Sequence, residues 1–206
     1  MSKATQTDAM GSIQRGIKRT LDFVMSAWGL ILLSPLFIII SVLMKFQGNG
    51  PIFFRQIRIG YKGKPFVILK FRTISKKTEK NTPQLIAKTS CKSSTPFEKF
   101  LREHHLDELP QLWNVLVGDM SLVGPRPERK YFIDKIMEHT DLYTVIYNMR
   151  PGLTSEATLY NGYTDTMEKM LKRLQMDISY FERRSLWLDF KIIIKTFVNI
   201  ISGNKF

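Results

Sequence analysis

The sequence predicts a mixed α/β fold that is mostly helical, with a membrane-inserted helix, a short β-hairpin and a compact domain. Three observations predict it. Residues 21–44 form an almost uninterrupted apolar stretch, and residues 50–72 read as two strands around a Gly-containing turn. Three later segments repeat apolar residues with helical spacing. A length of 206 residues suits one domain with appendages.

Composition limits the classes of protein and partner. The chain has 31 Lys and Arg against 18 Asp and Glu, a net charge of +13. This excess indicates an anionic partner, which can be a nucleic acid, a membrane surface or a phosphorylated substrate. Cys91 is the single cysteine, so a disulfide framework is excluded. The histidines, at 104, 105 and 139, lack the spacing of a zinc site.

The apolar stretch 21–44 is long enough for a transmembrane helix, which needs about 20 residues. Ser34 and Pro35 lie at its middle, and Pro35 favours a kink because it cannot donate its backbone hydrogen bond. Each arm then has about a dozen residues, or roughly 18 Å, which is too short for a hydrocarbon core of about 30 Å. Basic residues flank both ends, namely Arg15, Lys18, Arg19, Lys45, Arg55 and Arg58. A re-entrant helix and a kinked spanning helix both fit this pattern.

Two shorter features surround this stretch. Asp22, near its start, is expected to pair with Lys18 or Arg19 or to act as a simple helix cap. Residues 1–12 are polar and unpatterned, and we treat them as a native tail or an expression remnant.

A basic hairpin is expected next. Residues 50–59 and 64–72 read as strands joined by a turn at 60–63. Basic side chains on such strands either lie solvated at the strand edges or bind phosphate, and Lys70 and Arg72 are the candidates for phosphate. The polar segment 74–96 reads as a surface loop.

The centre of the sequence is a pair of adjacent carboxylates, Asp107 and Glu108. Apolar residues follow with helical spacing, at Leu109, Leu112, Trp113 and Leu116. Pro110 is tolerated only in a first turn, so we expect a helix from about Asp107 to Gly118. An acidic helix start needs no function. Two arginines nearby, Arg102 and Arg126, instead favour a site for a phosphorylated substrate with a divalent cation.

These motifs resemble the bacterial sugar transferases, small monotopic phosphoglycosyl transferases that begin glycan assembly on polyprenyl phosphate. The resemblance rests on Leu106-Asp107-Glu108-Leu109-Pro110-Gln111, Gly118-Asp119-Met120-Ser121 and Gly124-Pro125-Arg126-Pro127, and it extends from about residue 18 to residue 203. It implies a re-entrant helix over 13–46 with its break at Ser34-Pro35. It also implies a cytoplasmic catalytic domain over 47–206, with amphipathic helices at the interface of the bacterial inner membrane.

The resemblance implies transfer of a sugar 1-phosphate from a nucleotide diphosphate sugar, expected to be a UDP-sugar, to polyprenyl phosphate. Asp107 would be the nucleophile that forms a phosphosugar-aspartyl intermediate. Glu108 would bind Mg²⁺. Arg102 and Arg126 would hold phosphate oxygens, with Lys70 or Arg72 as further candidates.

The C-terminal third contains one departure from the family. Residues 150–154 read as a turn that resembles the family's Pro-Gly-(Ile/Leu)-Thr element. Many members continue with Gly-Trp-Ala-Gln, whereas this chain has Ser155-Glu156-Ala157-Thr158, so the sugar and the base stay open.

Two further helices are expected at the C-terminus. Residues 166–176 read as helical, and Asp177 and Tyr180 are expected to be structural. Residues 187–201 place Phe190, Ile193, Ile194, Phe197 and Ile201 on one face, which suits a core helix and a membrane-interface helix equally.

Two other classes of function compete with this interpretation. The charge would also suit a membrane-anchored nucleic-acid-binding protein, but no zinc finger, RNP-like run or helix-turn-helix pattern is present in the sequence. A non-catalytic membrane scaffold leaves the Asp-Glu pair and the Pro-Arg-Pro turn without a purpose. We therefore expect an enzyme that binds membrane lipid and does not bind nucleic acid.

Overall fold

The computed structural model describes residues 6–47, 50–73, 95–162, 164 and 166–202. Cys91 and nearly all of the predicted loop 74–96 lie outside these residues. The two loop residues that are described, Thr95 and Pro96, begin a helix, since Thr95 caps it with its side chain.

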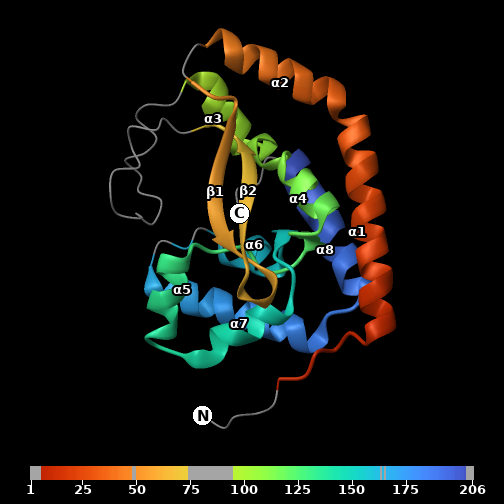
Figure 1. Ribbon diagram of the computed structural model, residues 1–206, viewed down its shortest axis with the longest axis vertical. Coiled ribbons are helices and arrows are strands. Elements are labelled where there is room, and N and C mark those ends of the chain that lie inside the picture. Colours follow the sequence, from red (N-terminus) through yellow and green to blue (C-terminus); the bar gives the residue numbers. More distant parts are fainter. Residues whose placement is uncertain (1–5, 48–49, 74–94, 163, 165, 203–206) are drawn as a thin grey trace.

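The architecture is mostly helical, as predicted, with two small sheets (Figure 1). The α-helices are α1 (Ser12–Leu32), α2 (Ser34–Phe46), α3 (Pro96–Glu103), α4 (Gln111–Val117), α5 (Lys130–Met137), α6 (Glu156–Asn161), α7 (Met167–Arg183) and α8 (Leu186–Ile201). The strands are β1 (Phe53–Ile59), β2 (Pro65–Phe71), β3 (Ser121–Val123) and β4 (Gly152–Thr154). The described residues also contain the 3₁₀ helices η1 (Tyr61–Gly63), η4 (Leu106–Glu108) and η5 (Asp141–Asn148).

The apolar N-terminal segment is bent where the sequence predicts a break. Helices α1 and α2 meet at Leu33 with an angle of 58°, and Pro35 lies in the first turn of α2. The Ser34 hydroxyl donates to the carbonyl of Ile31 at 2.7 Å, which satisfies one group at the bend. Within the described residues, neither helix by itself has the length and apolar character needed to cross a bilayer, and the two pass that test only as a bent pair.

The predicted hairpin is confirmed. Strands β1 and β2 pair antiparallel, with Phe54 opposite Lys70 and Ile57 opposite Val67, and η1 forms the turn between them. The hairpin lies in the middle of the view in Figure 1, with α3 at its upper end, α4 to its right and α5 and α7 below. Helix α4 and η4 both pack against β2, so the hairpin supports the segment that carries Asp107 and Glu108.

The second sheet corrects the sequence analysis. Residues 152–154, which we read as part of a turn, form β4 and pair in parallel with β3. The strands approach so closely that a Cβ built on Gly152 would lie 2.2 Å from the backbone nitrogen of Gly124. Glycine is therefore required at this crossing. Three-residue strands are too short to show the alternation from which a strand is read.

The main hydrophobic core is formed by residues of this sheet and of several helices. It contains Val123, Phe132, Ile136, Ile146, Leu174 and Phe181 among others, from β3, α5, η5 and α7. Helix α7 begins after the cap Thr166, as predicted, and continues to Arg183. Tyr180 is buried on α7 and its hydroxyl donates to Asp189 of α8, which fits the structural role expected of it.

Helix α8 has two different faces. Ile192 is buried, and Ile193 of the predicted apolar face packs against the core. The other described members of that face, Phe190, Ile194 and Phe197, are exposed, as is Trp187. The Trp187 and Phe190 rings stack on each other with centroids 5.5 Å apart. The core interpretation therefore holds for one face of α8 only.

Candidate active site

The two adjacent carboxylates lie on η4 and not at the start of α4, so the expected helix boundary is wrong. Helix α4 begins at Gln111 with Pro110 as its cap, and it ends at Gly118 as predicted, where φ is 98°. His105 precedes η4 with φ of 54°, a left-handed conformation that turns the chain sharply after α3. Asp107 and Glu108 therefore precede α4 and are not part of its first turn.

The buried face of α4 also differs from the prediction. Leu112 and Val115 are buried, but Trp113 is 51% exposed. The Asn114 side chain accepts from the backbone N–H of Leu69 at 3.0 Å and donates to the carbonyl of Val67 at 2.8 Å. This amide fixes α4 against β2, and η4 packs against the same strand.

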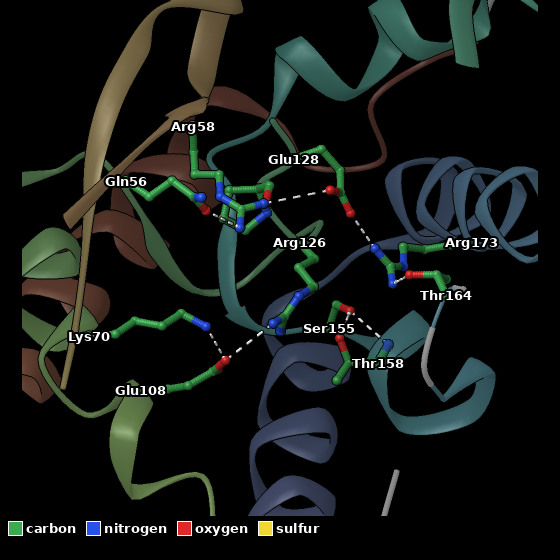
Figure 2. A network of polar contacts seen from close by, with 11 residues as sticks. Gln56, Arg58, Lys70, Glu108, Arg126, Glu128, Ser155, Thr158, Thr164 and Arg173 are labelled. Atoms are coloured by element: carbon green, nitrogen blue, oxygen red, sulfur yellow. Dashed lines mark hydrogen bonds and ion pairs between the residues drawn. The ribbon is translucent and has the colours of Figure 1, made fainter. Parts of the chain in front are cut away.

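Three of the predicted site residues meet in one ion-pair cluster (Figure 2). Oε1 of Glu108 accepts from Nζ of Lys70 at 2.5 Å and from Nη2 of Arg126 at 3.2 Å. Lys70 comes from β2 and Arg126 from the Pro-Arg-Pro turn after β3. The Lys70 and Glu108 side chains are mostly buried, whereas 35% of the Arg126 side chain is exposed. The cluster thus presents a guanidinium to an incoming anion.

The two carboxyl groups have opposite electrostatic environments. Burial raises the pKa of Glu108, but the charges of Lys70 and Arg126 outweigh it and hold that pKa well below its usual range. Burial and then the negative charge of Glu108 raise the pKa of Asp107 to about 6, against smaller opposing contributions from Lys70 and Arg126. Glu108 is therefore a permanent anion, whereas Asp107 is ionised at pH 7 but lies close to its titration range. Pairs of carboxyl groups whose pKa values are pushed apart are typical of catalytic sites.

The other two predicted phosphate-binding residues are Arg72, directly after β2, and Arg102, on α3. Arg72 is buried, donates to the carbonyl of Pro51 at 2.6 Å and lies 3.9 Å from Glu98, so its contacts join the hairpin to α3. Arg102 is half-buried in the last turn of α3, which packs against η4.

The sequence analysis missed the way α1 holds the segments around the site. Arg19 donates to the carbonyls of Val115 and Leu116 at 2.7 and 2.8 Å, at the end of α4. Asp22 is buried and accepts from the Ser121 hydroxyl at 2.7 Å and from the backbone N–H of Leu122 at 3.1 Å, on β3.

The expected pairing of Asp22 is only partly correct. Nζ of Lys18 lies 3.9 Å from Asp22, but its shorter contact is with Asp189 at 2.6 Å, and Arg19 turns to α4. A lone acid in an apolar stretch is the signal that could have pointed to a buried polar role for Asp22.

A second group missed from the sequence surrounds Glu128, directly after the Pro-Arg-Pro turn. Its carboxylate binds Arg173 of α7 and lies 3.7 Å from Nη1 of Arg58 on β1 (Figure 2). The position of Glu128 in the motif is a signal, but its two partners are distant in sequence.

The donor set around Asp107 and Glu108 can be compared with the needs of Mg²⁺. Among the residues that the structure describes, no three His, Cys, Asp or Glu side chains are grouped so that they could hold a metal alone. The hydrogen bonds from Lys70 and Arg126 both reach Oε1 of Glu108, and neither of them uses Oε2. Mg²⁺ is commonly held by one or two carboxylates together with substrate phosphates, so these residues fit Mg²⁺ in the presence of a phosphorylated substrate.

Comparison with known proteins places the chain in a family. The model of the bacterial sugar transferase family matches residues 13–203. UDP-glucose:undecaprenyl-phosphate glucose-1-phosphate transferase of Klebsiella pneumoniae is 39% identical over 190 residues, which cover 91% of this chain and 40% of that protein. A UDP-N-acetylgalactosamine-undecaprenyl-phosphate N-acetylgalactosaminephosphotransferase of Aeromonas hydrophila is 36% identical over 187 residues, 91% of this chain and 44% of its own length.

A third relative is covered over a larger share of its length. The UDP-glucose:undecaprenyl-phosphate glucose-1-phosphate transferase of Caulobacter vibrioides is 40% identical over 188 residues, 90% of this chain and 70% of the relative. The chain spans about two fifths of the length of the Klebsiella and Aeromonas relatives. With a family match over nearly all of its residues, this chain belongs to the bacterial sugar transferase family.

Proposed function

We propose that the protein transfers a sugar 1-phosphate from a UDP-sugar to polyprenyl phosphate, through a covalent phosphosugar-aspartyl intermediate on Asp107. The observation that carries this proposal is the cluster of Lys70, Glu108 and Arg126. The charges of all three residues act on the neighbouring carboxyl group of Asp107. Relatives named for transfer from UDP-glucose or UDP-N-acetylgalactosamine to undecaprenyl phosphate support the two substrate classes.

In the first half-reaction, a carboxylate oxygen of Asp107 attacks the phosphorus that bears the sugar. The new bond joins Asp107 to phosphorus, and the bond from that phosphorus to the bridging oxygen breaks. The nucleoside monophosphate leaves with the electron pair. A pKa of about 6 leaves Asp107 mostly ionised at pH 7, as a nucleophile requires.

In the second half-reaction, a phosphate oxygen of polyprenyl phosphate attacks the same phosphorus. The bond from Asp107 to phosphorus breaks, which restores the carboxylate and releases a polyprenyl diphosphate sugar. Because the two half-reactions occur in turn, donor and acceptor phosphates can use the same cations. Arg126 and Lys70 would hold phosphate oxygens in both halves, with Arg102 as a further candidate.

Glu108 would hold Mg²⁺ together with phosphate oxygens of the substrate. When bound, the ion offsets phosphate charge and polarises the bond that breaks. Lys70 and Arg126 keep Glu108 ionised, and so keep it able to act as a ligand.

The proposed setting is the cytoplasmic face of the bacterial inner membrane. A bent α1–α2 pair with basic flanks suits a helix that enters and leaves on one side, with its break at Ser34-Pro35. The exposed apolar face of α8 suits the membrane interface, where Trp is often found. A polyprenyl phosphate in the same leaflet would then reach Asp107 without leaving the bilayer.

The test is a panel of UDP-sugars with undecaprenyl phosphate and Mg²⁺, supplied to the full chain in lipid nanodiscs and scored by release of UMP. We expect release with at least one sugar, and radioactive sugar in the lipid fraction. No release with any donor, together with salt-dependent binding of random DNA, would favour the nucleic-acid alternative. If the protein shows neither UMP release nor DNA binding, the scaffold alternative is favoured.

A further inference from the structure

The carboxylate of Glu128 lies between two guanidinium groups that come from different parts of the chain (Figure 2). One oxygen binds Arg173 of α7, and the other lies 3.7 Å from Nη1 of Arg58 on β1. All three side chains are mostly buried, with 21% of Arg58, 14% of Glu128 and 11% of Arg173 exposed. Arg126 extends away from this group and reaches Glu108.

Three positive charges are therefore crowded on one side of the active site. The pKa of Arg58 is lowered to about 10, mainly by burial and in smaller part by the charge of Arg126, while the charge of Glu128 opposes the change. Burial also lowers the pKa of Arg173, again with Arg126 acting against its charge and Glu128 supporting it. Glu108 raises the pKa of Arg126, and Glu128 adds to that effect. Glu128 is thus a carboxylate that favours the charged form of all three arginines.

The same residue is fixed to the hairpin through the backbone. The N–H of Ile59 donates to the carbonyl of Glu128 at 3.0 Å, and Nη1 of Arg58 donates to the carbonyl of Pro127 at 3.1 Å. The two residues that follow Arg126 are therefore both attached to β1. Arg173 ties the Glu128 side chain to α7 at the same time, and its other nitrogen donates to Thr164.

We infer that Glu128 is a positioning residue for Arg126: it binds Arg58 and Arg173, offsets their repulsion of Arg126, and holds the turn that directs Arg126 to Glu108 and the donor phosphates. The inference rests on the proposed function and deepens it. A positioning role and a simple charge effect predict opposite changes in donor binding when the charge of Glu128 is removed. A buried anion near a phosphate site would weaken donor binding, so removing its charge would strengthen binding if it did not position Arg126.

The test compares Glu128→Gln with Asp134→Asn, a matched carboxylate-to-amide change in the exposed pair of Lys130 and Asp134 on α5. For E128Q we expect the KM for the UDP-sugar to rise and kcat to fall, with kcat/KM at least tenfold below that of D134N. A lower KM with unchanged kcat, or kinetics within twofold of D134N, would overturn the inference. Absence of UMP release by the unmodified protein would instead reject the proposed function.

A double-mutant cycle with Arg126→Lys separates positioning from general support of the fold. If Glu128 acts through Arg126, E128Q should cost at least tenfold alone but less than about threefold in the R126K background. Equal losses in both backgrounds would overturn the inference. Should E128Q fail to fold, Glu128→Asp takes its place, because it keeps the charge but shortens the reach. We then expect a partial loss with the same dependence on Arg126, and full activity of E128D would reject the positioning role.

Discussion

Nζ of Lys70 lies 2.5 Å from Oε1 of Glu108, and this contact joins two residues that are 38 positions apart. It connects the end of the hairpin to the turn that carries Asp107. The contact keeps Glu108 charged, and the charge of Glu108 in turn helps to raise the pKa of Asp107. The two carboxyl groups therefore take different roles although they are neighbours in sequence.

Replacing Asp107, the proposed nucleophile, should separate activity from stability. We expect Asp107→Asn to abolish turnover, because an amide cannot form the aspartyl-phosphate bond. A residual rate within tenfold of the unmodified protein would mean a barrier change of only about 1.4 kcal/mol, too little for loss of a nucleophile. The measurement is UMP release by the purified variant, with D134N as the control.

The same substitution should stabilise the fold. The pKa of Asp107 is about 6 in the folded protein, against its ordinary value of 3.8. A raised carboxyl pKa favours the folded state below about pH 4, and this contribution is lost as pH rises through 6. At pH 7 the ionised, buried carboxylate therefore opposes folding, by up to about 3 kcal/mol from the size of this shift. D107N should unfold at higher urea concentration than the unmodified protein at pH 7 but not at pH 4. A lower midpoint at pH 7 would contradict this.

The first half-reaction should depend on pH through the same group. Because only the ionised Asp107 can attack, kcat/KM for the UDP-sugar should fall about tenfold per pH unit below pH 6. Glu108 stays ionised throughout, since its pKa lies far lower. UMP release measured between pH 5 and 8 tests this, and a flat profile would exclude Asp107 as the titrating nucleophile.

A divalent cation should be required, and Glu108→Gln should weaken its binding. The amide loses the negative charge that attracts Mg²⁺ but keeps the size of the side chain. We expect at least a tenfold higher Mg²⁺ concentration for half-maximal activity, with part of the rate restored at saturating Mg²⁺. Full activity in excess EDTA would reject the metal proposal.

The bend between α1 and α2 should determine topology. Replacing Ser34 with Ala and Pro35 with Leu leaves a long apolar helix, which should drift to a spanning arrangement and lose activity. The test places a single Cys at Ser12 in a Cys91→Ser background and labels intact cells with a reagent that cannot cross the inner membrane. The Ser34-Pro35 protein should stay unlabelled and the altered one should react. Labelling of the Ser34-Pro35 protein would mean that the segment spans the membrane.

Features written in short stretches of sequence could be predicted, and those that depend on distant contacts could not. The bend near Pro35, the hairpin and the helix that begins near residue 166 follow from local residue types, and the structure confirms them. Lys70 and Arg72 looked equivalent in sequence, yet only Lys70 contacts Glu108 while Arg72 binds Pro51. The difference between their contacts depends on how β2 packs against η4, and no local sequence pattern contains that information.

The contacts of helix α1 have a consequence for the design of a shortened protein. Its first turns are not a detachable anchor, because Arg19 caps the end of α4 and Asp22 binds β3, the strand that leads to Arg126. A shortened protein that begins at the hairpin would leave Ser121 and the carbonyl of Val115 without these partners. Solubilisation by truncation would therefore damage the catalytic centre, whereas replacing exposed apolar residues such as Trp28, Ile31 and Leu32 with polar ones would leave those contacts in place.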